Sequence, residues 1–131
     1  MAPARKVNLL KLLENQPPRA NFHVLEIDRN YTVRVARTAG RFPWHYHPNG
    51  DEGWFVFEGR LRIEREDSAV ELERGDFTTI PRGVRHSPEA LVPGTIVVIF
   101  NLRELGMVLD DPEADLGGFR ESDLTRPESR T

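Results

Sequence analysis

The residues best suited to chemistry begin with two histidines one position apart. His45 and His47 precede an Asn49-Gly50 dipeptide, and Glu52 follows shortly after. Side chains alternate along a strand, so the two histidines would point to the same face. Because Asn-Gly is a strong hairpin signal, we expect residues 48–51 to form a loop that pairs His47 with Glu52 across adjacent strands. Directly opposite residues share a face, with Cβ atoms about 5 Å apart.

These side chains form a candidate metal site. Two imidazoles and a carboxylate suit a divalent ion such as zinc, with bonds of about 2.0–2.2 Å. Asp51 would lie within the loop, so Glu52 is the expected ligand. A fourth donor must come from a distant strand, and His86, which follows a Pro81-x-Gly83 turn, is the candidate. A single strand histidine is more often a surface or satisfied core residue, and His23, which has no companion, keeps that interpretation.

The elements that must position these residues are mostly short strands. Leucines at 9, 12 and 13 predict a short amphipathic helix within 7–15, ended by Pro17-Pro18. Strands are expected at 22–27, 31–39, 42–47, 52–58, 60–65, 69–73, 77–80, 84–87 and 95–101, separated by turn residues. Such a series predicts an all-β sandwich or barrel. From Arg103 onward the chain is polar and is expected to be irregular.

Two spaced motifs give the chain a resemblance to the cupins, which are small jelly-roll (double-stranded β-helix) barrels. The first motif consists of Gly40, His45-x-His47, Glu52 and Gly59, and the second of Gly75, Pro81-x-Gly83 and His86. Ala90 stands where the family usually has asparagine. The resemblance implies that the metal ligands are His45, His47, Glu52 and His86.

The resemblance also suggests how the chain is organised. Residues 1–21 would form an N-terminal arm with a short helix, 22–102 the cupin β-barrel, and 103–131 a polar, acidic C-terminal tail. Small cupins commonly dimerise, and a homodimer would cover exposed sheet edges here. The helix within 7–15 and the strand at 22–27 are the expected contributors.

The rest of the pocket should come from side chains that face into the barrel. The expected lining residues are Trp54, Val56, Phe57, Phe77, Val98, Phe100 and Arg34. For the apolar residues the alternative is ordinary packing, and for the arginine it is a solvated side chain. Arg34, Arg37 or Arg41 could hold a substrate carboxylate or phosphate by bidentate bonds. Alternation places Arg34 and Arg37 on opposite faces, so at most one of these two points inward.

Composition excludes several classes of protein. The chain has no cysteine, which rules out thiolate metal sites, catalytic thiols and disulfides. The net charge is −3, and no basic cluster is interleaved with aromatic residues, so no nucleic-acid partner is expected. No apolar run approaches the roughly 20 residues needed to cross a bilayer. We therefore expect a cytoplasmic protein with a small-molecule substrate and no membrane partner.

The implied cofactor is one divalent transition metal: Fe, Mn, Ni or Zn. The sequence does not choose among them, because the order of affinities is general to such sites and purified protein carries whichever metal was available. Three functions remain open: an oxygenase for a small organic molecule; a non-oxidative isomerase, epimerase, lyase or cyclase; and a non-catalytic binding module. The chain looks closest to the compact cupins grouped as mannose-6-phosphate-isomerase-like, a label that names no substrate for it.

Overall fold

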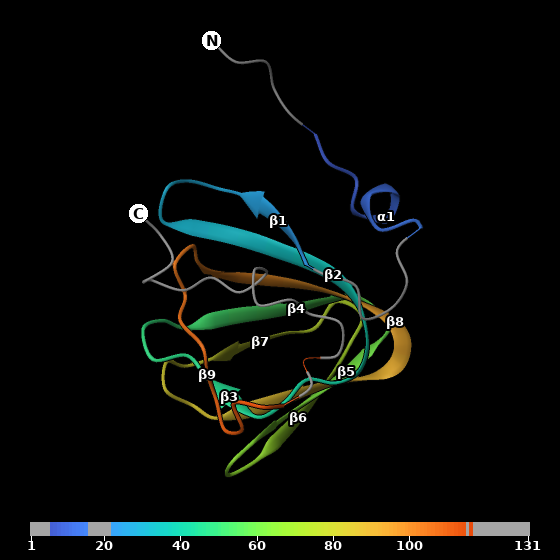
Figure 1. The fold of residues 1–131 in the computed structure, drawn as a ribbon. Helices are drawn as coiled ribbons and strands as arrows, with labels where there is room; N and C mark the ends of the chain where they lie inside the picture. The colour runs from blue at the N-terminus through green and yellow to red at the C-terminus, as the bar shows by residue number, and fades with distance from the viewer. Residues whose placement is uncertain (1–5, 16–21, 115, 117–131) are drawn as a thin grey trace.

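A computed structural model describes residues 6–15, 22–114 and 116. Within these residues nine strands form one continuous sheet that curls into a barrel, and the helix lies outside it (Figure 1). The elements are α1 (Leu9–Leu12), β1 (His23–Glu26), β2 (Tyr31–Arg41), β3 (His45–Tyr46), β4 (Glu52–Glu58), β5 (Arg60–Arg65), β6 (Ala69–Glu73), β7 (Phe77–Ile80), β8 (His86–Leu102) and β9 (Val108–Leu109). The expected all-β jelly-roll barrel is confirmed. None of the helical residues described here forms a segment long and apolar enough to span a bilayer.

The long strand β8 closes the barrel, because its two halves have different neighbours. From Thr95 onward it pairs with β2 and β4, whereas its first residues pair with β3 and β5. The strand β2 follows β8 from one wall to the other: after a bulge between Thr38 and Gly40, it still pairs with β8, and Gly40 lies opposite Ala90. Figure 1 shows β8 bending sharply as it passes from one side of the barrel to the other. One strand therefore contributes to both walls.

Alternation along β4 separates the interior from the outer face. Glu52, Trp54 and Val56 are buried, and the residues between them are only half-buried. The core cluster comprises Trp54, Val56, Leu61, Ile63, Leu72, Ile80, Val97 and Ile99. Moving along β4 from Val56 to Glu52, the inward side chains change from apolar to charged. This change marks where the packed core gives way to the candidate site.

Four consecutive strands, β4 to β7, have the bounds predicted from the sequence. Two other predictions were wrong in detail. The predicted strands 84–87 and 95–101 are parts of one long strand that begins at His86 and continues through Gly94, at φ +88°, although residues 91–94 have no partner in the pairing register of the described strands. The predicted strand 42–47 is reduced to His45–Tyr46. Pro43 has no N–H to donate to a ladder, which accounts for the late start of β3.

Contacts with the barrel continue past residue 102, the predicted end of the barrel. Leu105 is 4% exposed, and β9 pairs with β3 through Tyr46 and Val108. Arg85 forms an ion pair with Asp110. The fold therefore extends to at least Asp110, while residues 115 and 117–131 of the expected tail lie outside the described residues.

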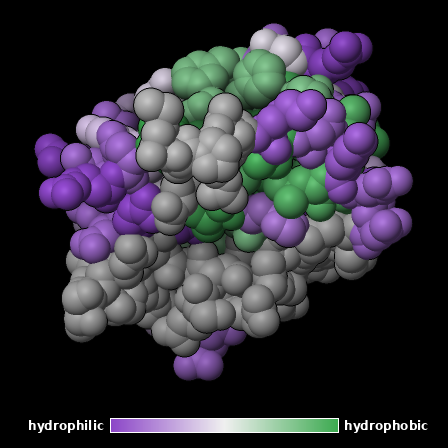
Figure 2. Space-filling model, turned by 90° about the horizontal axis from the view of Figure 1, so that it is seen from above, coloured by the Kyte–Doolittle hydropathy of each residue, from purple (hydrophilic) through white to green (hydrophobic). Residues whose placement is uncertain are grey.

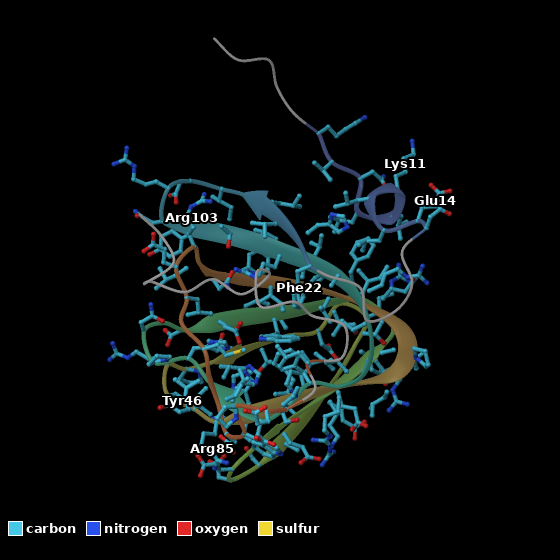
Figure 3. The ribbon with its side chains drawn as sticks, in the orientation of Figure 1. Lys11, Glu14, Phe22, Tyr46, Arg85 and Arg103 are labelled. Atoms are coloured by element: carbon cyan, nitrogen blue, oxygen red, sulfur yellow. The ribbon has the colours of Figure 1, made fainter. Side chains whose placement is uncertain are left out.

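The N-terminal helix is shorter than expected but has the predicted character. The side chain of Asn8 accepts a hydrogen bond from the backbone N–H of Lys11 at 3.0 Å, which caps the first turn. Leu13 is 1% exposed, so the arm is attached by an apolar side chain. Lys11 and Glu14 point away from the barrel (Figure 3). Residues 1–5 and 16–21 of the expected arm lie outside the described part of the chain.

Gly59, between β4 and β5, offers a test of the packing. Its φ is +97°, and an added Cβ would lie 2.4 Å from Oγ1 of Thr95. Gly59→Ala should lower the free energy of unfolding by about 3 kcal/mol or more, which combines left-handed strain with overpacking. Gly75 has φ +90° with nothing within 4 Å of an added Cβ, so Gly75→Ala should cost only about 1–2 kcal/mol. Equilibrium urea unfolding measures both, and equal losses would contradict the clash with Thr95.

Candidate metal centre

Three of the four histidines meet at one end of the β3–β8 ladder. His45 lies directly opposite His86 in the register of β3 and β8, and His47 directly follows β3. The ring centroids lie 4.2 Å apart for His45 and His86, 4.9 Å for His45 and His47, and 5.4 Å for His47 and His86. All three are buried, and one nitrogen from each ring lies within 4.8 Å of the others. The cluster is compatible with metal binding.

Hydrogen bonds to the main chain set the tautomer of each ring. The acceptors of Nδ1 are the carbonyl oxygens of Pro43 for His45 at 2.7 Å, Gly106 for His47 at 2.8 Å and Val84 for His86 at 2.9 Å. A carbonyl oxygen can only accept, so each Nδ1 carries a proton and donates it. In a neutral imidazole the lone pair is then on Nε2. Histidines that bind metals typically make this second hydrogen bond.

Glu52, the first residue of β4, brings a carboxylate to the same point. Its Oε1 lies 3.0 Å from Nε2 of His47 and 3.4 Å from Nε2 of His86. Both Nε2 atoms are buried without a well-oriented hydrogen-bond partner among the described residues. Two atoms bound to one ion at about 2.1 Å are separated by about 3.0 Å at a right angle and about 3.4 Å at a tetrahedral angle. The two separations therefore fit ligands that share an ion.

The electrostatics favour the cation-binding protonation states of Glu52 and His45, whereas His47 must give up a proton to bind an ion. Burial, followed by the neighbouring His86 and His47, lowers the pKa of His45 from 6.5 to about 3. Burial also opposes a charge on His47, but the hydrogen bond and charge of Glu52 outweigh it and raise the pKa of His47, against the influence of Arg34. Burial alone would raise the pKa of Glu52, yet its contacts with His47 and His86 bring that pKa well below its ordinary range. Glu52 is therefore ionised and His45 neutral.

Trp54 holds the carboxylate in place. Its indole Nε1–H donates to Oε1 of Glu52 at 3.1 Å, and both side chains are buried. The two residues share the inner face of β4 because they are two positions apart. An indole only donates, so this hydrogen bond favours the ionised carboxylate. The sequence predicted Trp54 as a lining residue but not as the hydrogen-bond partner of Glu52.

The predicted hairpin over residues 48–51 is wrong, although His47 and Glu52 do meet. In the described part of the chain β3 pairs with β8 and β9, and β4 pairs with β7 and β8, so these two strands are not partners. The carboxamide of Asn49 instead donates to the carbonyl oxygen of Glu104 and accepts from the N–H of Gly106, both at 2.8 Å. Asn49 thereby holds the segment whose carbonyl oxygen orients His47.

The loop after His47 is also attached to the turn before His86. The carboxylate of Asp51 accepts from the backbone N–H of Arg82 at 2.7 Å. The N–H of Gly83 donates to the carbonyl oxygen of His47 at 2.8 Å. The two motifs are therefore joined by main-chain contacts, and Asp51 acts there while Glu52 points at the histidines.

A cavity of about 100 Å³ adjoins the cluster. The side chains of His45, His47 and Glu52 form part of its wall. The other lining residues include Phe22, Phe42, Trp54, Leu61, Ile99, Leu105 and Met107, with Arg34, Thr38, Arg41 and Asn101 as polar members. Phe22 is labelled in Figure 3, at the approach to β1. Of the seven lining residues expected from the sequence, Trp54 and Arg34 line this cavity.

The other five expected lining residues lie elsewhere: Val56, Phe57, Phe77, Val98 and Phe100. Val56 belongs to the packed core. Phe77 and Phe100 are 56% and 41% exposed, and their rings lie near each other on the outer face, with centroids 6.3 Å apart. The reason is register: Trp54 lies opposite Ile99 of β8 and Thr78 of β7, so residues one position away point outward.

Several lining residues were missed because they flank the predicted barrel. Leu105 and Met107 belong to the segment that was expected to be an irregular tail. Their signal in the sequence was a short apolar stretch, Leu105-Gly106-Met107, within polar surroundings. Asn101 ends the apolar run of β8 and was included in that strand without a role.

Comparison with known proteins gives the same class of fold. The family model described as "Cupin domain" matches residues 31–100. The uncharacterized protein YdbB of Bacillus subtilis is 36% identical over 87 residues, which are 65% of this chain and 76% of that protein. Protein SchB of Streptomyces halstedii is 31% identical over 97 residues, which are 72% of this chain and 67% of that protein.

A solved structure agrees with these matches. A crystal structure of a cupin-2 domain-containing protein from Shewanella frigidimarina superposes with a TM-score of 0.67 at 28% identity, covering 72% of this chain and 91% of that one. The curled sheet and the histidine cluster define a barrel with a candidate metal centre. The chain belongs to the cupin family.

Elemental analysis tests the ligand set. Protein expressed in defined medium with Zn, Fe, Mn or Ni should bind about one ion per chain, as expected for a single site. His47→Ala and His86→Ala should each lower the affinity by more than about 100-fold, since losing an outer hydrogen bond alone costs about 10–100-fold. His23→Ala, which changes the one histidine outside the cluster, is the control. If the two variants retain as much metal as the parent chain, the site is wrong.

The hydrogen bond from Trp54 to Glu52 has its own test. Trp54→Phe keeps an aromatic side chain but removes the donor, so metal affinity should fall about 10–100-fold in a chelator competition. Trp44→Phe is the matched control, because Trp44 packs against the guanidinium of Arg85, with Arg85 Cζ 5.7 Å from its ring centroid, rather than against the cluster. Equal affinities for the two variants would remove Trp54 from the site.

Proposed function

We propose that this chain is a divalent-metal-dependent cupin enzyme of the oxygenase type that acts on a small organic molecule. The observation that carries the proposal is the buried cluster of three histidines, with the Glu52 carboxylate against two of them, beside a largely apolar cavity. His45, His47, Glu52 and His86 would hold the ion. Three neutral imidazoles and one carboxylate suit Fe, Mn, Ni or Zn better than Mg or Ca.

The residues of the chain have distinct parts in this mechanism. A bound ion would supply Lewis-acid activation of a substrate oxygen and, if redox-active, a path for electrons to dioxygen. The carbonyl oxygens of Pro43, Val84 and Gly106 keep the imidazoles oriented, and Trp54 keeps Glu52 oriented. The apolar lining keeps water away from reactive species.

The lining supports a compact aromatic or enolic substrate. Phe22, Phe42 and Trp54 present aromatic surface to the cavity, and Leu105 and Met107 present aliphatic surface. The cavity volume of about 100 Å³ is of the same order as the roughly 150 Å³ that holds benzene in an apolar protein cavity. A molecule of about one ring is therefore the expected size.

A non-oxidative function is the second candidate: an isomerase, epimerase, lyase or cyclase. It is favoured by Asn101 and Arg34, which line the cavity beside the cluster. Hydrogen-bond donors next to a Lewis acid would stabilise an enolate, the intermediate that such reactions share. In this mechanism the ion would polarise a carbonyl group without changing its oxidation state. A non-catalytic binding module is the third function.

Oxygen uptake separates these functions. The Fe(II)-loaded full chain, offered a panel of phenols, enols and diketones, should consume dioxygen only when a substrate is present. His86→Ala should abolish the uptake, and His23→Ala should leave it within about twofold of the parent chain, as for a surface substitution. Conversion of a panel compound without oxygen uptake would support the non-oxidative function instead. Stoichiometric metal with neither result would contradict catalysis on this panel and favour a binding module.

The expected homodimer remains a prediction. The strand β1 lies at the edge of the sheet and pairs with β2 in the described residues. Val24 and Ile27, on and next to it, are 47% and 60% exposed. Figure 2, seen from this side, shows apolar side chains bordered by hydrophilic ones. An exposed edge with apolar side chains is the kind of surface that association covers.

A further inference from the structure

Of the polar side chains that line the cavity outside the metal cluster, Arg34 and Asn101 are buried, whereas Thr38 and Arg41 are more exposed. Arg34 of β2 and Asn101 of β8 are 8% and 6% exposed, and both line the cavity. Arg34 lies opposite Ile99, and Thr32 lies opposite Asn101, so the two polar residues are diagonal neighbours on the inner face of the β2–β8 ladder. Diagonal neighbours are within reach of each other for long side chains. Both groups can therefore act on one bound molecule.

The orientation of the Asn101 amide follows from its neighbour. The hydroxyl of Thr32 donates to Oδ1 of Asn101 at 3.1 Å in a buried hydrogen bond. With the oxygen turned toward Thr32, the other half of the carboxamide is the NH₂ group, which only donates. Asn101 thus offers the cavity a hydrogen-bond donor.

Arg34 contributes a cation with several donors. A guanidinium has five N–H donors in a planar fork, so it can bind a carboxylate in addition to contacts within the chain. Arg34 lines the same cavity as His47 and Glu52. Arg34 therefore lies near both the candidate metal centre and Asn101.

The surroundings strengthen such contacts. Phe22, Trp54 and Ile99 line the same cavity and reduce its access to water. Hydrogen bonds from charged donors to a carboxylate are stronger in a low-dielectric site than in water. A divalent ion held by three neutral imidazoles and one carboxylate adds a net charge near +1, which also attracts an anion.

We propose that Arg34 and Asn101 form an anion-binding subsite, and that the substrate is a small monocarboxylic acid with an apolar body of about one ring. The claim that the bound acid is a substrate rests on the proposed function. The claim that Arg34 and Asn101 bind an anion does not. The carboxylate would bind to the Arg34 guanidinium and the Asn101 NH₂ group. The apolar body would lie against the aromatic lining, beside Glu52 and the histidines.

Calorimetric titration of the zinc-loaded full chain tests the subsite with two matched pairs of probes: benzoate with benzamide, and butyrate with butyramide. In at least one pair the acid should bind about tenfold or more tighter than the neutral amide, as expected for charged hydrogen bonds. Asn101→Asp keeps the size of the side chain and the acceptor for Thr32 but adds a negative charge. It should weaken binding of the acid about tenfold or more and leave the amide unchanged.

Arg34→Gln should act in the same direction, and Arg37→Gln is its control. Arg37 lies on the opposite face of β2, with its guanidinium against Gly94, so its loss should leave both probes unchanged. If Arg34→Gln does not fold, the near-isosteric Asn101→Asp decides the question. Acid and amide of equal affinity in both pairs, or acid binding unaffected by Asn101→Asp, would overturn the subsite.

The same titrations on metal-stripped protein, with zinc content measured, separate this inference from the proposed function. Selective acid binding that persists without zinc and is lost in Asn101→Asp supports the subsite, even if the parent chain fails to hold zinc and the proposed function fails. Acid binding that disappears with the metal would show that the ion alone binds the anion. That result would overturn the subsite and leave the metal centre intact.

Discussion

The site depends on three hydrogen bonds from imidazole Nδ1–H groups to backbone carbonyl oxygens. They leave the lone pair of each neutral ring on Nε2, which in His47 and His86 lies beside Glu52, and without them either nitrogen of each ring could carry the proton. The three acceptors precede β3, precede β8 and follow β8. Ring orientation is therefore set by the main chain, which the sheet holds rigidly, and the cluster is as ordered as the barrel that surrounds it.

The barrel brings the donors together through one strand with two sets of neighbours. The first half of β8 places His86 opposite His45, and its second half pairs with β4, which begins with Glu52. Burying this many polar groups would be costly if they did not satisfy one another. Here each imidazole has a carbonyl oxygen on one nitrogen, and the carboxylate has the indole of Trp54. Within the cluster, the Nε2 atoms of His47 and His86 are buried without a well-oriented partner in the described chain, and both lie beside the Glu52 carboxylate.

Local spacing predicted the cluster and the strands from β4 to β7, because each of these features depends on residues a few positions apart. Which residues of β7 and β8 point into the barrel could not be predicted in the same way. Phe77 and Phe100 face outward because pairing with β4 sets the register, and no local pattern encodes that partner. The hairpin predicted from Asn49-Gly50 was wrong for the same reason. The Asn49 side chain makes tertiary hydrogen bonds with Glu104 and Gly106, which no local pattern encodes.

The position of the family match along the chain has a consequence for how such barrels diversify. It spans residues 31–100 and includes every side chain of the candidate metal centre. Phe22, Asn101, Leu105 and Met107 shape the cavity from outside that span. Replacement of these flanking segments would change the shape of the cavity and leave the candidate metal ligands unchanged. The family match thus covers the candidate metal centre, whereas the short segments that flank it would determine which molecules fit the cavity.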